Sequence, residues 1–76
     1  MTYPDSNLRN LLIDLARTLA SHRGWTWREP VAIRAALERG EPVWVIESNV
    51  QSRGMNVRVV LRQSDHSLVT AGYLPR

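Results

Sequence analysis

The chain has 76 residues, of which 43% are hydrophobic and 22% are charged, and it contains no cysteine. A chain of this length forms one domain at most and buries only about 60% of the surface that its unfolded form exposes. The composition excludes a disordered chain, a disulfide scaffold and a thiolate metal site, and no apolar run approaches the roughly 18 residues of a membrane span. We therefore expect a single small domain over residues 1–76, in the cytoplasm, that gains stability by associating with another chain.

The net charge of +3 is unevenly distributed along the chain. Residues 1–49 carry six arginines and six carboxylates, whereas residues 50–76 carry four arginines and one carboxylate, Asp65. All ten basic residues are arginine, whose planar guanidinium suits carboxylate and phosphate partners, although a GC-rich coding bias gives the same usage. The excess positive charge therefore lies in the C-terminal third.

Residues 7–23, NLRNLLIDLARTLASHR, show helical periodicity. Five leucines fall on one apolar stripe: Leu8, Leu11, Leu12, Leu15 and Leu19. Asp5 or Ser6 is a suitable N-cap and Gly24 a suitable stop, so the pattern predicts an amphipathic helix. The stripe is widened on one side, where a second element should pack, by Ile13, Ala16 and Ala20.

A second, shorter helix is predicted within residues 28–42, REPVAIRAALERGEP. Pro30 fits a first helical turn, and Gly40 fits the position that follows a helix. Arg34 and Glu38 would form an exposed pair one turn apart.

After Pro42 the apolar period changes from helical spacing to two. Three β-branched runs follow, separated by polar residues that favour turns, and they cover residues 43–49, 56–62 and 68–74. Consecutive strands usually pair in order. The sequence therefore predicts an α+β domain in which two N-terminal helices pack on one face of a three-stranded antiparallel meander (α-α-β-β-β).

The register of the strands can be predicted from their faces. A hairpin tip at Asp65 and His66 would pair Val59 with Gly72, and a loop over residues 51–54 would pair Ile46 with Val59. Both choices put the same residues on the helix-facing side, which we expect to be the core: Trp44, Ile46, Val57, Val59, Leu61, Leu68 and Leu74.

The opposite face of the predicted sheet is unusual because it is half apolar and half cationic. An antiparallel sheet usually alternates apolar residues inside with polar residues outside. Here the outer face is expected to carry Val45, Arg58, Val60, Arg62, Val69, Ala71 and Tyr73. Glu47 would lie across from Arg58 as a favourable cross-strand pair.

Four occupants of this outer face are compatible with the sequence. A second copy of the chain, or another protein, could pack on it. A segment of the chain itself that the prediction places elsewhere, such as the one with Trp25 and Trp27, could also cover it. Alternatively, arginine and tyrosine on a sheet could bind RNA or DNA. We take as candidate binding residues Val45, Arg58, Val60, Arg62, Val69 and Tyr73, with Arg53 as a possible loop contact.

Catalytic and metal sites find little support in the sequence. Ser64, Asp65 and His66 are neighbours in one turn, so their side chains cannot converge as a hydrolase triad. Only two histidines and no cysteines are present, so we expect no metal and no cofactor.

In element order alone, the chain resembles small toxin ribonucleases of the RelE and colicin groups. That resemblance implies metal-independent RNA cleavage by residues of the sheet, here Arg58, Arg62, His66, Thr70 and Tyr73. The interpretation that the residues favour is a non-enzymatic binding module, acting as a homodimer or as an adaptor for a protein partner through the outer face. A nucleic-acid-binding regulator and the ribonuclease are the alternatives.

Overall fold

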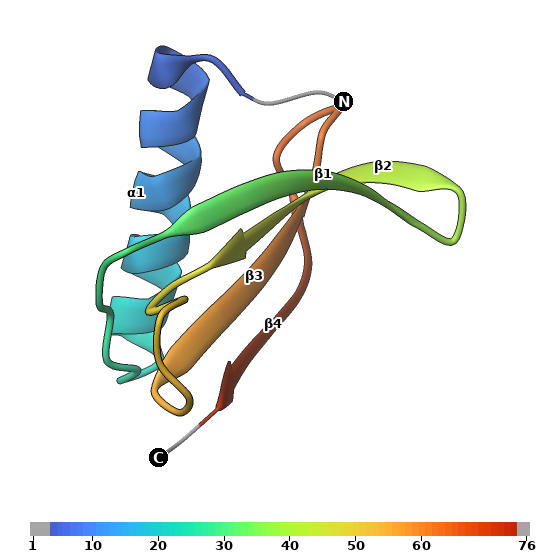
Figure 1. The fold of residues 1–76 in the computed structure, drawn as a ribbon. Coiled ribbons are helices and arrows are strands. Elements are labelled where there is room, and N and C mark those ends of the chain that lie inside the picture. Colours follow the sequence, from blue (N-terminus) through green and yellow to red (C-terminus); the bar gives the residue numbers. More distant parts are fainter. Residues whose placement is uncertain (1–3, 75–76) are drawn as a thin grey trace.

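The computed structural model describes residues 4–74, which contain one helix and four antiparallel strands (Figure 1). The helix is α1 (Ser6–His22), and the strands are β1 (Ala32–Glu38), β2 (Glu41–Glu47), β3 (Asn56–Arg62) and β4 (Leu68–Leu74). All four strands belong to one sheet in the order β1-β2-β3-β4. The α+β class is confirmed, but the prediction of two helices and three strands is wrong.

Helix α1 forms where its periodicity predicts it. The side chain of Asp5 accepts a hydrogen bond of 2.8 Å from the Leu8 amide, which caps the N-terminus. The buried side of the helix consists of Leu12, Ala16 and Ala20, all with no exposed surface. The side of the helix that is buried is therefore centred nearer to Ala16 and Ala20 than the leucine stripe predicts.

The predicted second helix is instead strand β1. Its residues pair with β2 throughout, from Ala32 opposite Glu47 to Glu38 opposite Glu41. Arg39 and Gly40 both have positive φ, 53° and 82°, as a two-residue hairpin turn requires. The left-handed glycine that suits the end of a helix thus serves equally well in a hairpin, and pairing with a valine-rich strand overrides the helix propensity of the alanines.

The β2–β3 hairpin has the predicted register, with Trp44 opposite Leu61, Ile46 opposite Val59 and Glu47 opposite Arg58. Its long loop is held by polar side chains at the ends of the two strands, of which Ser48 is buried and Asn56 is half-buried. The Ser48 hydroxyl accepts from the Val57 amide at 2.9 Å. The amide group of Asn56 donates to three loop carbonyls, those of Ser48, Asn49 and Ser52.

The β3–β4 hairpin is displaced by one residue from the predicted register. Val59 lies opposite Ala71 and Val57 opposite Tyr73, and a bulge follows at Val60/Leu61. The turn is longer than a two-residue tip, because the Arg62 amide donates to the Ser67 carbonyl. Since side chains alternate along a strand, the shift reverses the faces of the second half of β4.

The main core lies between α1 and the sheet (Figure 1). The predicted core residues Trp44, Ile46, Val57, Val59 and Leu61 are buried there. Leu68 and Leu74 are 41% and 57% exposed, so their placement in the core was wrong. Their place is taken by Ala71 and Tyr73, and the Tyr73 ring stacks on Trp25 at 5.7 Å between centroids. Trp27 also packs against this cluster.

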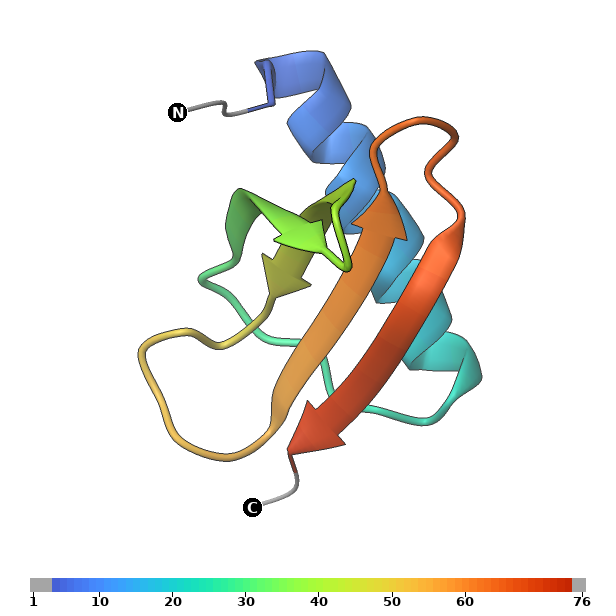
Figure 2. The ribbon, with the colours of Figure 1, turned by 90° about the vertical axis from the view of Figure 1, so that its right-hand side faces the viewer.

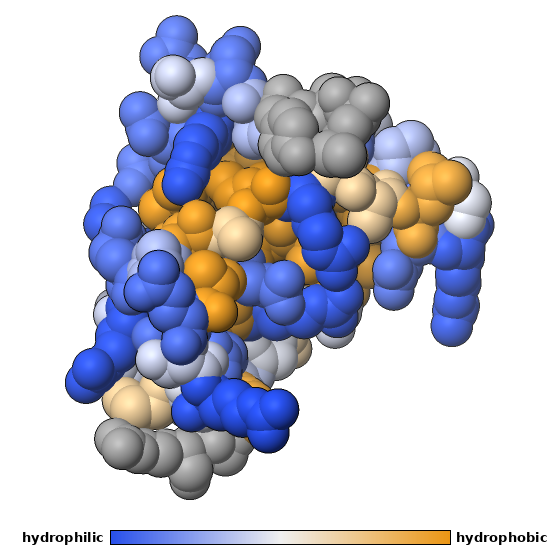
Figure 3. Space-filling model, viewed as in Figure 1, coloured by the Kyte–Doolittle hydropathy of each residue, from blue (hydrophilic) through white to orange (hydrophobic). Residues whose placement is uncertain are grey.

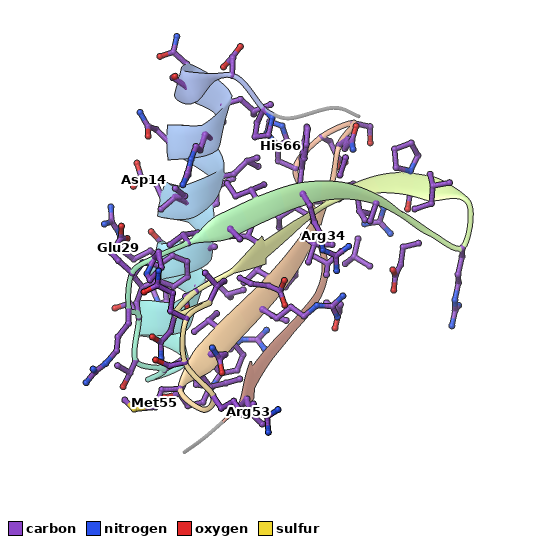
Figure 4. All side chains as sticks on the ribbon, in the orientation of Figure 1. Asp14, Glu29, Arg34, Arg53, Met55 and His66 are labelled. Carbon is purple, nitrogen blue, oxygen red and sulfur yellow. The ribbon has the colours of Figure 1, made fainter. Side chains whose placement is uncertain are left out.

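The surface reflects this arrangement. In Figure 3, hydrophilic side chains cover the outward side of α1, and apolar surface appears between the helix and β1. Figure 4 shows Asp14 projecting from α1 into solvent. Arg9 reaches across from the helix to donate to the Val31 carbonyl, 3.2 Å away, just before β1 begins. One flank of α1 is thereby fixed toward β1.

Candidate functional site

The candidate site is the outer face of the sheet, the side opposite α1. Its centre is a second apolar cluster, separate from the main core, in which Val43, Val45 and Val60 are 0%, 1% and 0% exposed. Ala36 and Val69 pack against these valines at the sides. We call these five residues the outer cluster.

The outer cluster is covered without any second layer of structure. The tip of the β1–β2 hairpin projects to the side of the sheet away from α1, so that the sheet is strongly curved (Figures 1 and 2). Curvature brings side chains of neighbouring strands together over the central valines. Val45 and Val60, predicted as binding residues, therefore lie on the outer face but beneath its surface.

Several charged side chains are exposed on the outer face. Arg62 Nε donates to Glu41 Oε1 at 3.0 Å, and its Nη1 donates to the Ser67 hydroxyl at 3.0 Å. Arg58 lies 3.9 Å from Glu47, which confirms the predicted cross-strand pairing. All four charged groups are more than a third exposed, so each pair contributes little to stability.

Arg34 is a further residue of this face that the sequence reasoning missed. It lies on β1, opposite Val45 of β2, and its side chain leaves the strand on the side away from α1 (Figure 4). The signal was present in the alternation of Ile33, Arg34 and Ala35, but the helical interpretation of this segment placed the arginine on a solvent-exposed helix surface.

Two hollows lie on the outer face, at opposite ends of the outer cluster. One has a volume of about 490 Å³ and is lined by Glu38, Arg39, Glu41, Arg62, Val69 and Thr70. The other has a volume of about 410 Å³ and is lined by Glu47, Asn56, Arg58, Gly72, Tyr73 and Leu74. The two hollows make the outer face concave. Each hollow contains one of the two arginine–glutamate pairs, so charge of both signs lies at the rim of this face.

Tyr73 does not belong to the outer face in the way that was predicted. The one-residue shift turns it toward the helix-facing side, where it stacks on Trp25. Thr70 lies opposite Val60 and points to the outer face. Of the residues that the ribonuclease resemblance would use, Arg62 and Thr70 line one hollow and Arg58 and Tyr73 line the other, while His66 lies in the β3–β4 turn, so the five do not meet in one site.

The β3–β4 turn is held by hydrogen bonds among its own polar residues. The Asp65 carboxylate accepts from the Ser67 amide at 2.9 Å, and His66 has a φ of 60°. Hydrogen bonds from the Ser67 hydroxyl and amide, together with nearby Arg62, lower the pKa of Asp65 below its ordinary value of 3.8. These hydrogen bonds stabilise the turn.

Arg53, the predicted loop contact, lies in the β2–β3 loop near Met55 (Figure 4). It lines a polar pocket of about 240 Å³ together with Arg28, Asn49, Ser52, Gly54 and Met55. The amide of Asn49 donates to the Gly54 carbonyl at 3.1 Å and fixes the shape of this loop. The pocket lies at the loop, apart from the outer cluster.

Among residues 4–74, no group of three or more potential ligands that could hold a metal ion is present, and the helix is too short and too polar to cross a membrane. Comparison with known proteins found no matching family model, no similar curated protein and no similar solved structure.

Proposed function

We propose that this chain is a protein-binding module that holds a segment of another protein in the concave outer face of its sheet. The observation that carries the proposal is the buried outer cluster, which lies between two charged hollows. Because its valines are already packed, the surface above them is preformed, which reduces the ordering cost of binding. Arginine is a residue type enriched at protein interfaces, and Arg34, Arg58 and Arg62 all lie at this rim.

The charge of the rim supports a protein partner over a nucleic acid. Four arginines lie at or beside the outer face, and three glutamates lie among them: Arg34, Arg39, Arg58 and Arg62 with Glu38, Glu41 and Glu47. A phosphate backbone binds where positive charge is in clear excess. Here Arg58 and Arg62 already face carboxylates. A segment that carries both signs of charge complements this rim better than a polyanion does.

The shape of the outer face supports a convex partner. Two concave surfaces that meet face to face leave a gap between them, whereas tight interfaces need close complementarity. A helix or a turn from a different protein fills such a surface. We therefore favour the adaptor interpretation over a homodimer that packs outer face on outer face.

The proposal can be tested with peptides selected from a random displayed library against the purified protein. The amide shifts caused by the selected peptides should map to β2, β3 and the tip of the β1–β2 hairpin. Binding should be lost in the double variant Arg34→Glu and Arg58→Glu. It should persist in Arg17→Glu, which changes an exposed arginine of α1 that pairs with Asp14 at 2.6 Å. Shifts confined to other surfaces would refute the proposal.

The nucleic-acid alternative is tested by the fluorescence anisotropy of labelled single-stranded RNA and duplex DNA. On our proposal both bind weakly and are released by moderate salt. Tight binding that is lost in the Arg34→Glu and Arg58→Glu variant would instead favour a nucleic-acid-binding regulator.

A further inference from the structure

The pocket at the β2–β3 loop differs in charge from the two hollows of the outer face. It has a volume of about 240 Å³ and is lined by Arg28, Asn49, Ser52, Arg53, Gly54 and Met55. We call it the loop pocket. Two of its lining residues are arginines and none is acidic, whereas both hollows of the outer face have glutamate beside arginine. The lining of the loop pocket therefore carries net positive charge.

The two arginines of the loop pocket have no carboxylate partner within residues 4–74. Neither Arg28 nor Arg53 forms an ion pair there, in contrast to Arg58 and Arg62 of the outer face. Glu29 follows Arg28 in the chain, but Figure 4 shows it beside α1, well away from Arg53. The charge of these two guanidinium groups is therefore not neutralised by the described part of the chain, and an anionic ligand could neutralise it.

The loop also contains hydrogen-bond donors that the described residues do not use. From residue 4 to residue 74, no acceptor is found for the amides of Arg53 and Gly54 or for the hydroxyl of Ser52. Gly54 is buried, and buried amides in folded proteins almost always have a partner. Successive amides in a turn commonly form a concavity that binds an anion. The loop pocket is therefore rich in donors that a ligand with several acceptor oxygens could satisfy.

Hydrogen bonds between two segments of the chain hold the loop pocket in shape. The Asn49 amide donates to the Arg28 carbonyl at 2.8 Å, and the Val50 amide donates to the Pro30 carbonyl at 3.2 Å. These bonds tie the segment between α1 and β1 to the β2–β3 loop, and the two segments lie side by side in Figures 1 and 2. Arginines from distant parts of the sequence thus line one preformed pocket, which reduces the ordering cost of binding.

Two residues of the lining have backbone conformations that side chains rarely adopt. Asn49 and Met55 have φ values of 55° and 57°. The Asn49 conformation is held by its own side chain, whose amide donates to the Gly54 carbonyl at 3.1 Å. Residues in such conformations cluster at ligand-binding sites, where the surrounding structure fixes them. The backbone of the loop is therefore consistent with a binding site.

We propose that the loop pocket binds the terminal phosphate group of a small molecule. The number of donors favours phosphate over carboxylate. Each guanidinium presents a planar fork that fits two oxygens. Two forks, a hydroxyl and two amides offer more donors than the two oxygens of a carboxylate can accept, whereas a terminal phosphate has three oxygens and nearly two negative charges.

The position of the loop pocket favours a small molecule over a nucleic acid. A nucleic-acid backbone binds along an extended groove of positive charge. The loop pocket is a local site, and the arginines of the outer face are interspersed with glutamates. This site is distinct from the concave outer face and does not depend on the proposed function.

Titration of the full chain with inorganic phosphate at constant ionic strength, followed by amide NMR spectra, tests the site. The amides of Arg53 and Gly54 should shift along a saturable curve. Phenyl phosphate, a monoester, should shift the same amides. Dimethyl phosphate, a singly charged diester, and acetate should bind roughly tenfold more weakly or worse, because each offers fewer oxygens and less charge.

Substitution of the two arginines gives a second readout. Arg28→Gln and Arg53→Gln should each raise the dissociation constant for phosphate by roughly tenfold, because each removes charge-assisted hydrogen bonds. Both arginines are exposed, so the melting temperature should not change. The matched control is Arg39→Gln, an exposed arginine of the β1–β2 turn that also lacks an ion pair within the described residues and should leave phosphate binding unchanged.

Several results would overturn the proposal. Shifts that grow linearly with phosphate and appear at arginines all over the surface would indicate charge screening alone. Binding that survives both substitutions would place the anion elsewhere, and acetate or single-stranded RNA that binds these amides more tightly than phosphate would refute the ligand class. The variant Arg34→Glu and Arg58→Glu should still bind phosphate, which separates this test from that of the outer face.

Discussion

Replacing Val60 by alanine should destabilise the isolated chain about as much as replacing Val59. The two valines are neighbours on β3 that point to opposite faces, and they are 0% and 1% exposed. Removing two methyl carbons from a buried site costs about 0.8 kcal/mol each, and the remaining cavity raises the total to about 2 to 3 kcal/mol. A domain of this size has a free energy of unfolding of roughly 5 to 10 kcal/mol, so both variants should remain folded.

Urea unfolding followed by circular dichroism measures this comparison. Both variants should show a lower midpoint with an unchanged slope, because the surface exposed on unfolding is nearly the same. Val50→Ala is the control, since Val50 is 43% exposed in the β2–β3 loop and should change stability by less than about 0.5 kcal/mol.

The result has a direct bearing on the outer face. If Val60→Ala behaves like Val50→Ala while Val59→Ala loses the full amount, then the outer cluster does not pack in the isolated chain, and our account of the concave face is refuted. Val60→Glu should be worse than either alanine variant, because it buries a carboxylate within an apolar cluster and should prevent folding.

Three further predictions concern the turns and β4. Gly40→Ala should cost about 1 kcal/mol in thermal unfolding because φ is 82° there, whereas Gly72→Ala should be nearly neutral; neither new Cβ meets an atom within 4 Å. Tyr73→Ala should destabilise the chain by about 3 kcal/mol in urea unfolding, whereas a solvent-facing tyrosine would cost little. The Asp65 carboxyl should titrate below 3.8 by NMR and return toward it in Ser67→Ala; because folding lowers this pKa, its contribution to stability is present above pH 3.8 and lost as the pH falls through the folded value.

The helix and the central hairpin were predicted from local patterns alone. The leucines of α1 recur at helical spacing, and Asp5 stands where a cap is needed, as its bond to Leu8 confirms. The alternation of β2 and β3 fixed their pairing, including Glu47 opposite Arg58. In these segments the local preference and the tertiary contacts agree, so the sequence was sufficient.

For β1 the local preference and the fold disagree. Alanine, leucine and glutamate in residues 32–38 favour a helix by a few tenths of a kcal/mol each. Pairing along the whole of β2 contributes more than that preference, and the turn at Arg39 and Gly40 makes the pairing possible. A left-handed glycine after an apolar segment does not reveal which of the two structures precedes it.

The register of β4 and the fate of the outer face were decided only by the tertiary structure. Register is well specified where one face of a strand is apolar and the other is polar, but β4 is apolar on both, with Val69, Ala71 and Tyr73 on one set of positions and Leu68 and Leu74 on the other. A longer turn and a bulge then chose the register. The sequence by itself determined that the sheet has a second apolar face; the curvature of the folded sheet determined that the valines of this face pack against one another and leave a charged, concave rim exposed.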